Sequence, residues 1–222
     1  MEVIMKNDKL HPNILAVRII SNVSPDLAEK LSLGERHKSL GIITADSDDV
    51  TYTGLDEATK AADVEVVYAR SFYGGAANAN TKLAGEVIGI LAGPSPAEVR
   101  SGLNACITFM ENDAYFISAN EDDSIVYYAH TVSRTGSYLS KVAGITEGEA
   151  LAYVIAPPLE AIYALDAAMK AADVRLCEFY GPPSETNFGG GLLTGSQSAC
   201  YAACNAFAEA VRSVAERPKE YQ

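Results

Sequence analysis

Four carboxylates are the residues of this chain whose types and spacing could do chemistry. Asp46, Asp48 and Asp49 fall in one short segment directly after an apolar run, and Glu86 stands in the apolar stretch GEVIGIL. Carboxylates can hold a divalent metal ion, but no histidine lies beside these four in the sequence. Acids directly before a helical pattern are also ordinary capping residues. We therefore expect no metal site and no cofactor here.

The histidines and cysteines show no catalytic or metal-binding spacing. His11, His37 and His130 lie far apart in the sequence, so each is interpreted as a structural histidine. The cysteines lie in apolar strand or helix patterns, and none forms a C-x-x-C pair, which favours buried reduced thiols. No G-x-S-x-G elbow, P-loop, H-E-x-x-H or Rossmann fingerprint is present, so we predict that the chain is not an enzyme. The cysteines are Cys106, Cys177, Cys200 and Cys204.

Composition and charge narrow the possible partners. The chain has 222 residues, is 48% hydrophobic and carries a formal net charge of −12. This charge argues against nucleic acid and anionic membrane surfaces as partners, whereas cationic or neutral small ligands remain compatible. No apolar run approaches the roughly 20 residues of a membrane span, and the N-terminus lacks the apolar region of a signal peptide. We expect a soluble, cytoplasmic protein.

An internal repeat must organise these residues. The segment LDEATKAADV (residues 55–64) recurs as LDAAMKAADV (residues 165–174), with eight of ten positions identical. In each copy a strand-like run and a loop rich in small residues follow. The loop is eight residues longer in the first copy, and loops that differ between equivalent copies often carry function. The chain is therefore predicted to be a tandem duplication with two domains.

The hydrophobic pattern predicts an α+β fold in which helices pack on a mostly antiparallel sheet in each half. A capping box at Ser95 to Glu98 predicts the start of one helix, and Ser24-Pro25-Asp26 predicts the start of another. Met1 to Asn13 is polar and irregular, so ordered structure is expected to begin at Ile14. The expected strands are 14–23, 40–45, 64–73, 87–92, 114–118, 125–132, 151–156, 174–180 and 191–194, and the expected helices are 24–33, 50–62, 95–110, 157–172 and 196–215.

Lys60 and Lys170 hold the same position in the two copies, three residues before the aspartate that ends the helix. A cation in the last turn of a helix interacts favourably with the helix dipole, by about 0.3–1 kcal/mol. That effect would explain one lysine. Two copies of Lys-Ala-Ala-Asp, with small residues beside the charge, also indicate an edge that packs against a neighbouring molecule.

The segment EAIYALDAAMKAADVRLCEFY (residues 160–180) resembles the bacterial microcompartment (BMC) shell domain. Two copies in one chain are similar to the tandem class of that family. The stretches ITADSDDVTYTGLDEATKAADVEVVYARSFYGG, VSRTGSYLSKVAG and GSQSACYAACNAF resemble its ethanolamine-utilisation members. The resemblance runs from about Leu15 to Arg212 and implies a structural shell protein located in a bacterial microcompartment.

The resemblance also implies a particular architecture. Two tandem circularly permuted BMC domains are expected, over residues 14–112 and 113–216, and three chains are expected to form a pseudohexagonal disc. Two similar domains in each of three chains give six similar edges, which can meet edge to edge with other discs and other shell proteins. Lys60 and Lys170 match the edge lysine of the family.

The family further implies pores and a ligand. The glycine-rich loops line pores, so Ser71, Phe72, Tyr73, Gly74 and Gly75 are predicted to form the gate of a central pore. Phe72 fits equally well as the end of a core strand. The expected ligand is ethanolamine, whose ammonium group needs a carboxylate and an aromatic wall. The residues predicted to bind it are Asp49, Glu86, Phe116 and Thr186.

Two of these assignments compete with simpler structural roles. Asp49 also fits the N-cap of a helix, and Glu86 also fits a surface position on a strand. A different class of protein also fits the sequence, namely a small-molecule-sensing trimer that does not assemble into a shell. Reversible two-dimensional assembly would separate the two functions.

Overall fold

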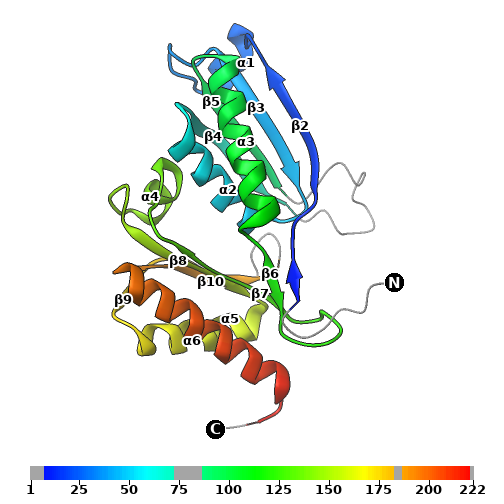
Figure 1. Cartoon of the computed structure of the whole chain (residues 1–222), viewed down its shortest axis with the longest axis vertical. Coiled ribbons are helices and arrows are strands. Elements are labelled where there is room, and N and C mark those ends of the chain that lie inside the picture. The colour runs from blue at the N-terminus through cyan, green and yellow to red at the C-terminus, as the bar shows by residue number, and fades with distance from the viewer. Residues whose placement is uncertain (1–7, 73–86, 183–186, 221–222) are drawn as a thin grey trace. The chain divides into compact units, whose positions relative to one another are not determined.

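The computed structural model describes residues 8–72, 87–182 and 187–220. The chain divides into two compact units. The first unit consists of His11–Ala114 together with Gly136–Leu139. The second unit consists of Met1–Leu10, Tyr115–Thr135 and Ser140–Gln222. Each unit contains one sheet with two long helices on it, which confirms the predicted α+β class (Figure 1).

The first unit has a four-stranded antiparallel sheet in the order β2-β3-β5-β4. The helices α2 and α3 contact each other and lie on the same face of this sheet (Figure 1). The elements of this unit are β2 (Ile14–Ile20), α1 (Pro25–Lys30), β3 (Ser39–Ala45), α2 (Asp48–Ala61), β4 (Glu65–Ser71), β5 (Val87–Gly93) and α3 (Pro96–Asn112).

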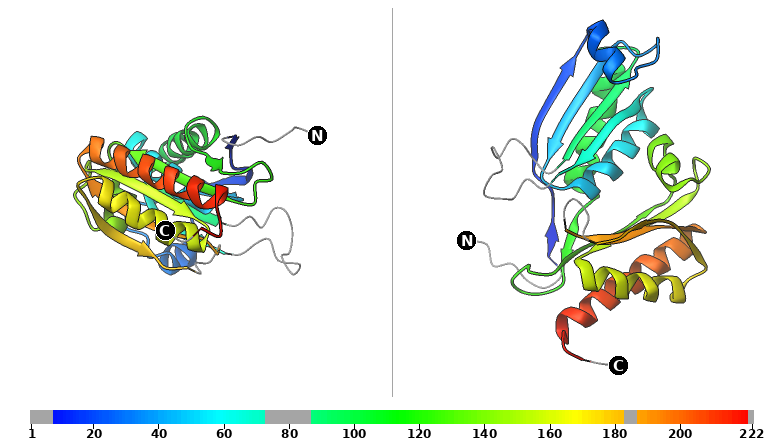
Figure 2. Two further views of the ribbon diagram at one scale, coloured as in Figure 1. Left: turned by 90° about the horizontal axis from the view of Figure 1, so that it is seen from below. Right: turned by 180° about the vertical axis from the view of Figure 1, so that it is seen from behind.

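The second unit has a six-stranded sheet in the order β1-β6-β7-β8-β10-β9. Views from below and behind show α5 and α6 together on one face of it (Figure 2). The chain passes from the first unit into the second within α4. The elements are β1 (Lys9–Leu10), β6 (Phe116–Ser118), β7 (Val126–Val132), α4 (Ser137–Ala143), β8 (Ala150–Ala156), α5 (Pro158–Ala171), β9 (Val174–Tyr180), β10 (Gly189–Gly195) and α6 (Gln197–Glu216).

The duplication extends to the topology of the sheets. The order β7-β8-β10-β9 repeats the order β2-β3-β5-β4, and every pair of neighbours is antiparallel. Each helix pair buries its apolar stripe against its own sheet, with Leu55 and Leu103 buried in the first unit and Leu165 and Phe207 in the second. The N-cap half of the predicted capping box is confirmed, because the Ser95 hydroxyl accepts the Glu98 N–H. The Glu98 carboxylate accepts the Asp63 N–H.

The expectation that order begins at Ile14 is wrong. Lys9 and Leu10 form β1, which pairs with Ile117 and Phe116 of β6, and the Asp8 carbonyl accepts the Ser118 N–H at 3.1 Å. A strand of two residues has too few positions to show an alternating pattern. Its partner lies more than a hundred residues away in the sequence, so local sequence could not have revealed the pairing.

Candidate functional site

Three strand ends meet at one end of the first unit's sheet. Val87, the first residue of β5, pairs with Ala45 at the end of β3 and with Ser71 at the end of β4. The segment that follows Ala45 leads into α2, which begins at Asp48. The acidic segment, the start of the long first-copy loop and the start of β5 are therefore positioned at the same end of this sheet.

Asp49 lies in the first turn of α2 and is 6% exposed. The N-cap of this helix is Ser47, so the alternative in which Asp49 is the N-cap is wrong. The Asp48 carboxylate accepts the Asp49 N–H at 2.9 Å, and both acids favour the positive end of the helix dipole.

Ser71 ends β4, and its hydroxyl hydrogen-bonds to the Tyr52 hydroxyl of α2. The Tyr52 ring in turn lies 6.1 Å from the ring of Tyr138. Phe72 follows directly after the strand and is half-buried. The base of the predicted gate loop is therefore tied to α2 through a side-chain hydrogen bond.

Phe116 belongs to β6 of the second unit, where it joins an aromatic cluster that the sequence analysis missed. Its ring stacks on Tyr128, with centroids 5.4 Å apart, and lies 6.1 Å from Phe188. Tyr128 also stacks on His130 at 5.6 Å and meets Tyr153 edge-on. Aromatic residues at alternate positions of β7 are the sequence signal that could have revealed this wall.

The remaining predicted residues cannot be placed. Tyr73, Gly74, Gly75, Glu86 and Thr186 lie outside the described residues. Asp49 and Phe116 belong to different compact units. The four-residue ligand site therefore stays a prediction, supported by the burial of Asp49 and by the aromatic surroundings of Phe116.

Asp56 is a buried acid that the sequence analysis did not single out. Its two carboxylate oxygens accept the backbone N–H groups of Gly136 at 2.7 Å and Leu139 at 2.8 Å. Its side chain is 1% exposed, and Lys60 Nζ lies 3.8 Å from it. Burial raises the pKa of the Asp56 carboxyl above its ordinary value, and the two backbone N–H groups and Lys60 partly offset this rise. The identity of this position with Asp166 in the repeat was the available signal.

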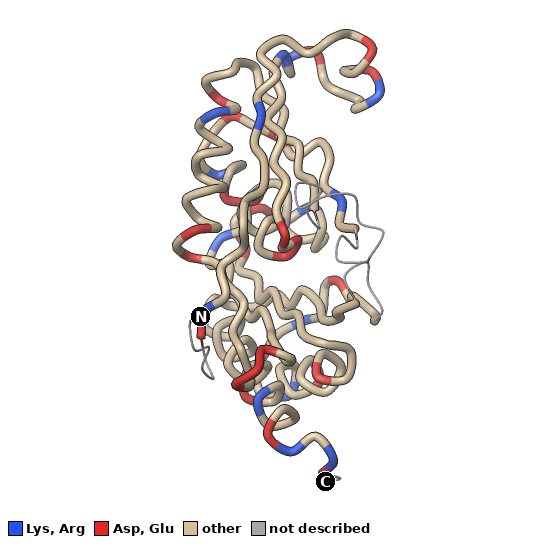
Figure 3. The backbone as a smooth tube through the Cα atoms, turned by 90° about the vertical axis from the view of Figure 1, so that its right-hand side faces the viewer, with Lys and Arg blue, Asp and Glu red and all other residues tan. Residues whose placement is uncertain are grey.

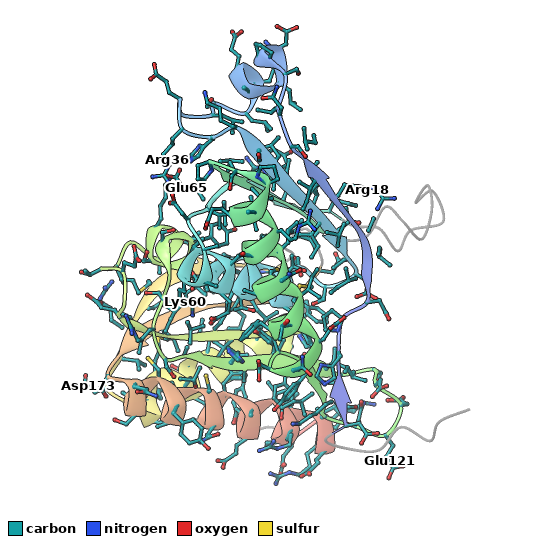
Figure 4. The ribbon with its side chains drawn as sticks, turned by 45° about the horizontal axis from the view of Figure 1, so that its top comes forward. Arg18, Arg36, Lys60, Glu65, Glu121 and Asp173 are labelled. Carbon is teal, nitrogen blue, oxygen red and sulfur yellow. The ribbon has the colours of Figure 1, made fainter. Side chains whose placement is uncertain are left out.

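The two lysines that are predicted to lie at an edge differ in their surroundings although the sequence aligns them. Lys60 lies on α2 (Figure 4). Its side chain is 26% exposed and contacts the Glu57 carboxylate in addition to Asp56. The Lys170 side chain is 74% exposed, with Nζ 2.5 Å from the exposed Asp166 carboxylate. Of the two, Lys170 is the more accessible to another molecule.

The raised pKa of Asp56 gives a testable pH dependence. The folded chain holds a proton on Asp56 at pH values somewhat above 3.8, where the unfolded chain has released it. Through this group, stability should therefore fall as the pH rises through that range. The side chain of Asp56→Asn cannot titrate. We therefore expect the amount by which the free energy of unfolding of wild type exceeds that of this variant to shrink as the pH rises from about 4 to about 6. Urea unfolding at both pH values measures this, and a constant difference would contradict it.

The other titratable side chains show no reactive arrangement. His37 is 6% exposed, with Nε2 3.7 Å from the Glu65 carboxylate, as expected for a structural histidine. Burial raises the pKa of the Cys106 and Cys204 thiols to about 12, so neither is a ready nucleophile. Within residues 8–72, 87–182 and 187–220, no group of three or more His, Cys, Asp or Glu side chains could hold a metal ion. None of the described helices is both long and apolar enough to cross a membrane.

A surface hollow of about 970 Å³ lies in the second unit. Strand β7 and helix α6 form its walls, and the Arg212 guanidinium donates to the Tyr127 hydroxyl at 2.8 Å. Among the described residues, none of those predicted to bind ligand or form the gate lines this hollow. Acidic residues outnumber basic ones in the chain as a whole (Figure 3).

The comparisons with known proteins identify the class first. A model of the BMC domain, the domain of bacterial microcompartment shell proteins, matches residues 39–121. The bacterial microcompartment shell protein EutL of Clostridium perfringens is 75% identical over 96% of this chain and 99% of its own length. EutL of Escherichia coli is 56% identical over 95% of this chain and 96% of its own length. The chain belongs to the EutL family of bacterial microcompartment shell proteins.

Solved structures agree with this assignment. The crystal structure of ethanolamine utilization protein EutL from Leptotrichia buccalis has a TM-score of 0.95 and 72% identity, covering 98% of this chain and all of that one. A trimeric shell protein, PduB, shares the fold at a TM-score of 0.74 and 22% identity, covering 92% of this chain and 89% of that one. The predicted tandem BMC fold and the location in a microcompartment shell are thereby confirmed. Shell proteins are structural, which also confirms that the chain is not an enzyme.

Proposed function

We propose that three copies of this chain form a pseudohexagonal tile in the shell of an ethanolamine-utilisation microcompartment, with a gated central pore and smaller pores that bind ethanolamine. The observation that carries the proposal is the 75% identity to a EutL shell protein over nearly the whole chain. The repeated sheet order supports a ring of six similar domains, contributed by three chains. The two BMC domains are proposed to span residues 14–112 and 113–216.

Edge contacts between tiles are assigned to Lys170 and Lys60, which hold the same position in the two repeats. The partners are other copies of the tile and other shell proteins. The sensing trimer that does not assemble remains the alternative function. Electron microscopy of concentrated protein separates the two, because only a shell protein should form layers of edge-sharing discs.

The gate is assigned to Ser71, Phe72, Tyr73, Gly74 and Gly75. Glycines allow a loop to take two backbone courses at small steric cost, and the aromatic rings can close an opening. The hydrogen bond between Ser71 and Tyr52 supports this assignment, because it gives the loop a fixed base on α2. Ligand binding should favour one state of the pore, which we propose is the closed one.

Ethanolamine is assigned to Asp49, Glu86, Phe116 and Thr186. Two observations support this: Asp49 is buried, and β5, which begins directly after Glu86 in the sequence, starts beside the strand that leads to Asp49. Asp49 and Glu86 would hold the ammonium group, Phe116 would supply the aromatic wall and Thr186 a hydroxyl.

Replacing Glu86 with glutamine should weaken ethanolamine binding at least tenfold without unfolding the protein, because a charge-assisted hydrogen bond contributes about 1.5–3 kcal/mol. Isothermal titration calorimetry with ethanolamine measures the affinity. Glu121→Gln removes one exposed carboxylate elsewhere and should bind like wild type. Equal affinity for wild type and Glu86→Gln would remove Glu86 from the site.

A further inference from the structure

The segments Ser24–Leu27 and Gly136–Leu139 are equivalent parts of the two repeats. Each opens a short helix: α1 follows β2, and α4 follows β7, the strand equivalent to β2 in the second repeat. The helices end alike: Ser32 and Gly144 both have a positive φ, of 53° and 62°. The Leu33 N–H donates to the Ala28 carbonyl just as the Ile145 N–H donates to the Ser140 carbonyl. A contact made by one segment is therefore a template for the other.

Gly136–Leu139 lies directly on α2. The Asp56 carboxylate accepts the N–H groups of Gly136 and Leu139, and the Thr59 hydroxyl accepts the Ser137 N–H at 3.1 Å. Leu139 is only 1% exposed. The face of α2 that carries Asp56 is thus covered within the chain.

The equivalent face of α5 is uncovered. It carries Asp166 in place of Asp56, with a side chain that is 60% exposed. Around it lie large apolar side chains at helical spacing, which would be unusual on a surface that stays in water. Leu27, the equivalent of Leu139, is 39% exposed instead of 1%. The exposed apolar residues of this α5 face are Leu159 (63%), Ile162 (45%), Tyr163 (49%) and Met169 (36%).

One pair of substitutions between the repeats is matched across this contact. Where the covered face uses the Ser137 N–H and the Thr59 hydroxyl, the other repeat has Pro25 and Met169. Proline has no N–H to donate, and methionine has no hydroxyl to accept it. Both members of the hydrogen bond are thus replaced together by apolar groups, as expected if Pro25 contacts Met169.

We infer that the Ser24–Leu27 segment of one copy covers the α5 face of a second copy, with Leu27 packed among Leu159, Ile162 and Met169 and the Leu27 N–H donating to the Asp166 carboxylate. The inference rests on the proposed trimer and names its contact between chains. The contact joins two different surfaces, so repeating it from chain to chain gives a closed ring of three when the rotation between neighbours is a third of a turn.

The inferred contact between copies differs in one detail from the contact between Gly136–Leu139 and α2 within the chain. A Cβ at Gly136 would lie 2.7 Å from the Asp56 carbonyl oxygen, whereas Ser24 carries a Cβ. The segment from the second copy must therefore lie slightly farther from α5, and the Ser24 hydroxyl is available to bridge the added distance to Asp166.

Cysteine pairs test the inference. In the full chain, Pro25→Cys with Met169→Cys should form disulfides between copies under mild oxidation, giving covalent dimers and closed covalent trimers on a non-reducing gel. Ser137→Cys with Thr59→Cys is the matched internal control, and its cross-link should stay within a single chain. Each variant with only one of the two new cysteines should form no covalent dimers or trimers. This result would show that the native cysteines do not form the cross-links.

The outcomes separate this inference from the proposed trimer. If wild type is a trimer by light scattering but the Pro25–Met169 pair gives only single chains, the contact is wrong and the trimer stands. If wild type is a single chain in solution, both are wrong. Leu27→Asp supplies a second measurement: a folded chain by circular dichroism that has lost the trimer agrees with the inference, and an unchanged trimer contradicts it.

Discussion

Replacing Lys170 with alanine should abolish ordered sheets of the protein while leaving the chain folded. The Lys170 side chain is 74% exposed in the last turn of α5, so its ammonium group can reach an acceptor on a neighbouring tile. Loss of a hydrogen bond to a charged group costs about 1.5–3 kcal/mol. A tile of three chains loses that contact at several edges at once, so even the lower figure suffices to stop growth of a layer.

Lys60→Ala is the matched comparison for Lys170→Ala. The Lys60 ammonium group already contacts Glu57 and lies near buried Asp56, so its removal should weaken sheets less and lower the stability of the fold more. Negative-stain electron microscopy at equal protein concentration measures sheet formation, and thermal unfolding measures stability. If Lys170→Ala folds like wild type and still forms intact sheets, this lysine does not make the contact between tiles.

Asp56→Ala should destabilise the first unit by about 2–4 kcal/mol, because it leaves the buried N–H groups of Gly136 and Leu139 without an acceptor. The Lys60 ammonium group would also lose a nearby carboxylate. Urea unfolding followed by circular dichroism gives the free energy of unfolding for the variant and for wild type.

Glu57→Ala is the control for Asp56→Ala on the same helix. It removes a partly exposed carboxylate that pairs with Lys60, and exposed ion pairs contribute about 0–1 kcal/mol. We expect its free energy of unfolding to lie within about 1 kcal/mol of wild type. Equal losses for both variants would show that Asp56 has no special role in holding Gly136–Leu139 on α2.

Most of the fold could be predicted because the signals were local. The apolar run before Asp46 and the Ser95 cap each mark an element through neighbouring residues, and both elements form where expected. The repeat gave a second source of evidence, because each helix or strand recognised in one half predicts the equivalent element in the other half. Strand β1 was missed because two residues carry no period and their partner strand is distant in sequence.

The candidate site was harder to predict because identical positions in the repeats have different neighbours. Lys60 aligns with Lys170, and Asp56 aligns with Asp166. Lys60 and Asp56 nevertheless lie at a covered helix face in the first copy, whereas the equivalent pair lies at an open face in the second copy. Sequence alone reports the residue type and not what covers it. The aromatic cluster around Phe116 was missed for a related reason, since its rings come from strands that only the sheet order brings together.

Electron cryo-microscopy of concentrated protein would decide whether this chain is a shell tile. We expect closed rings of three chains that share edges in a flat layer, with α1 of each chain against α5 of the next and Lys170 at the boundary between rings. Closed rings that never share edges would favour the sensing trimer, and particles of single chains would contradict the tile altogether.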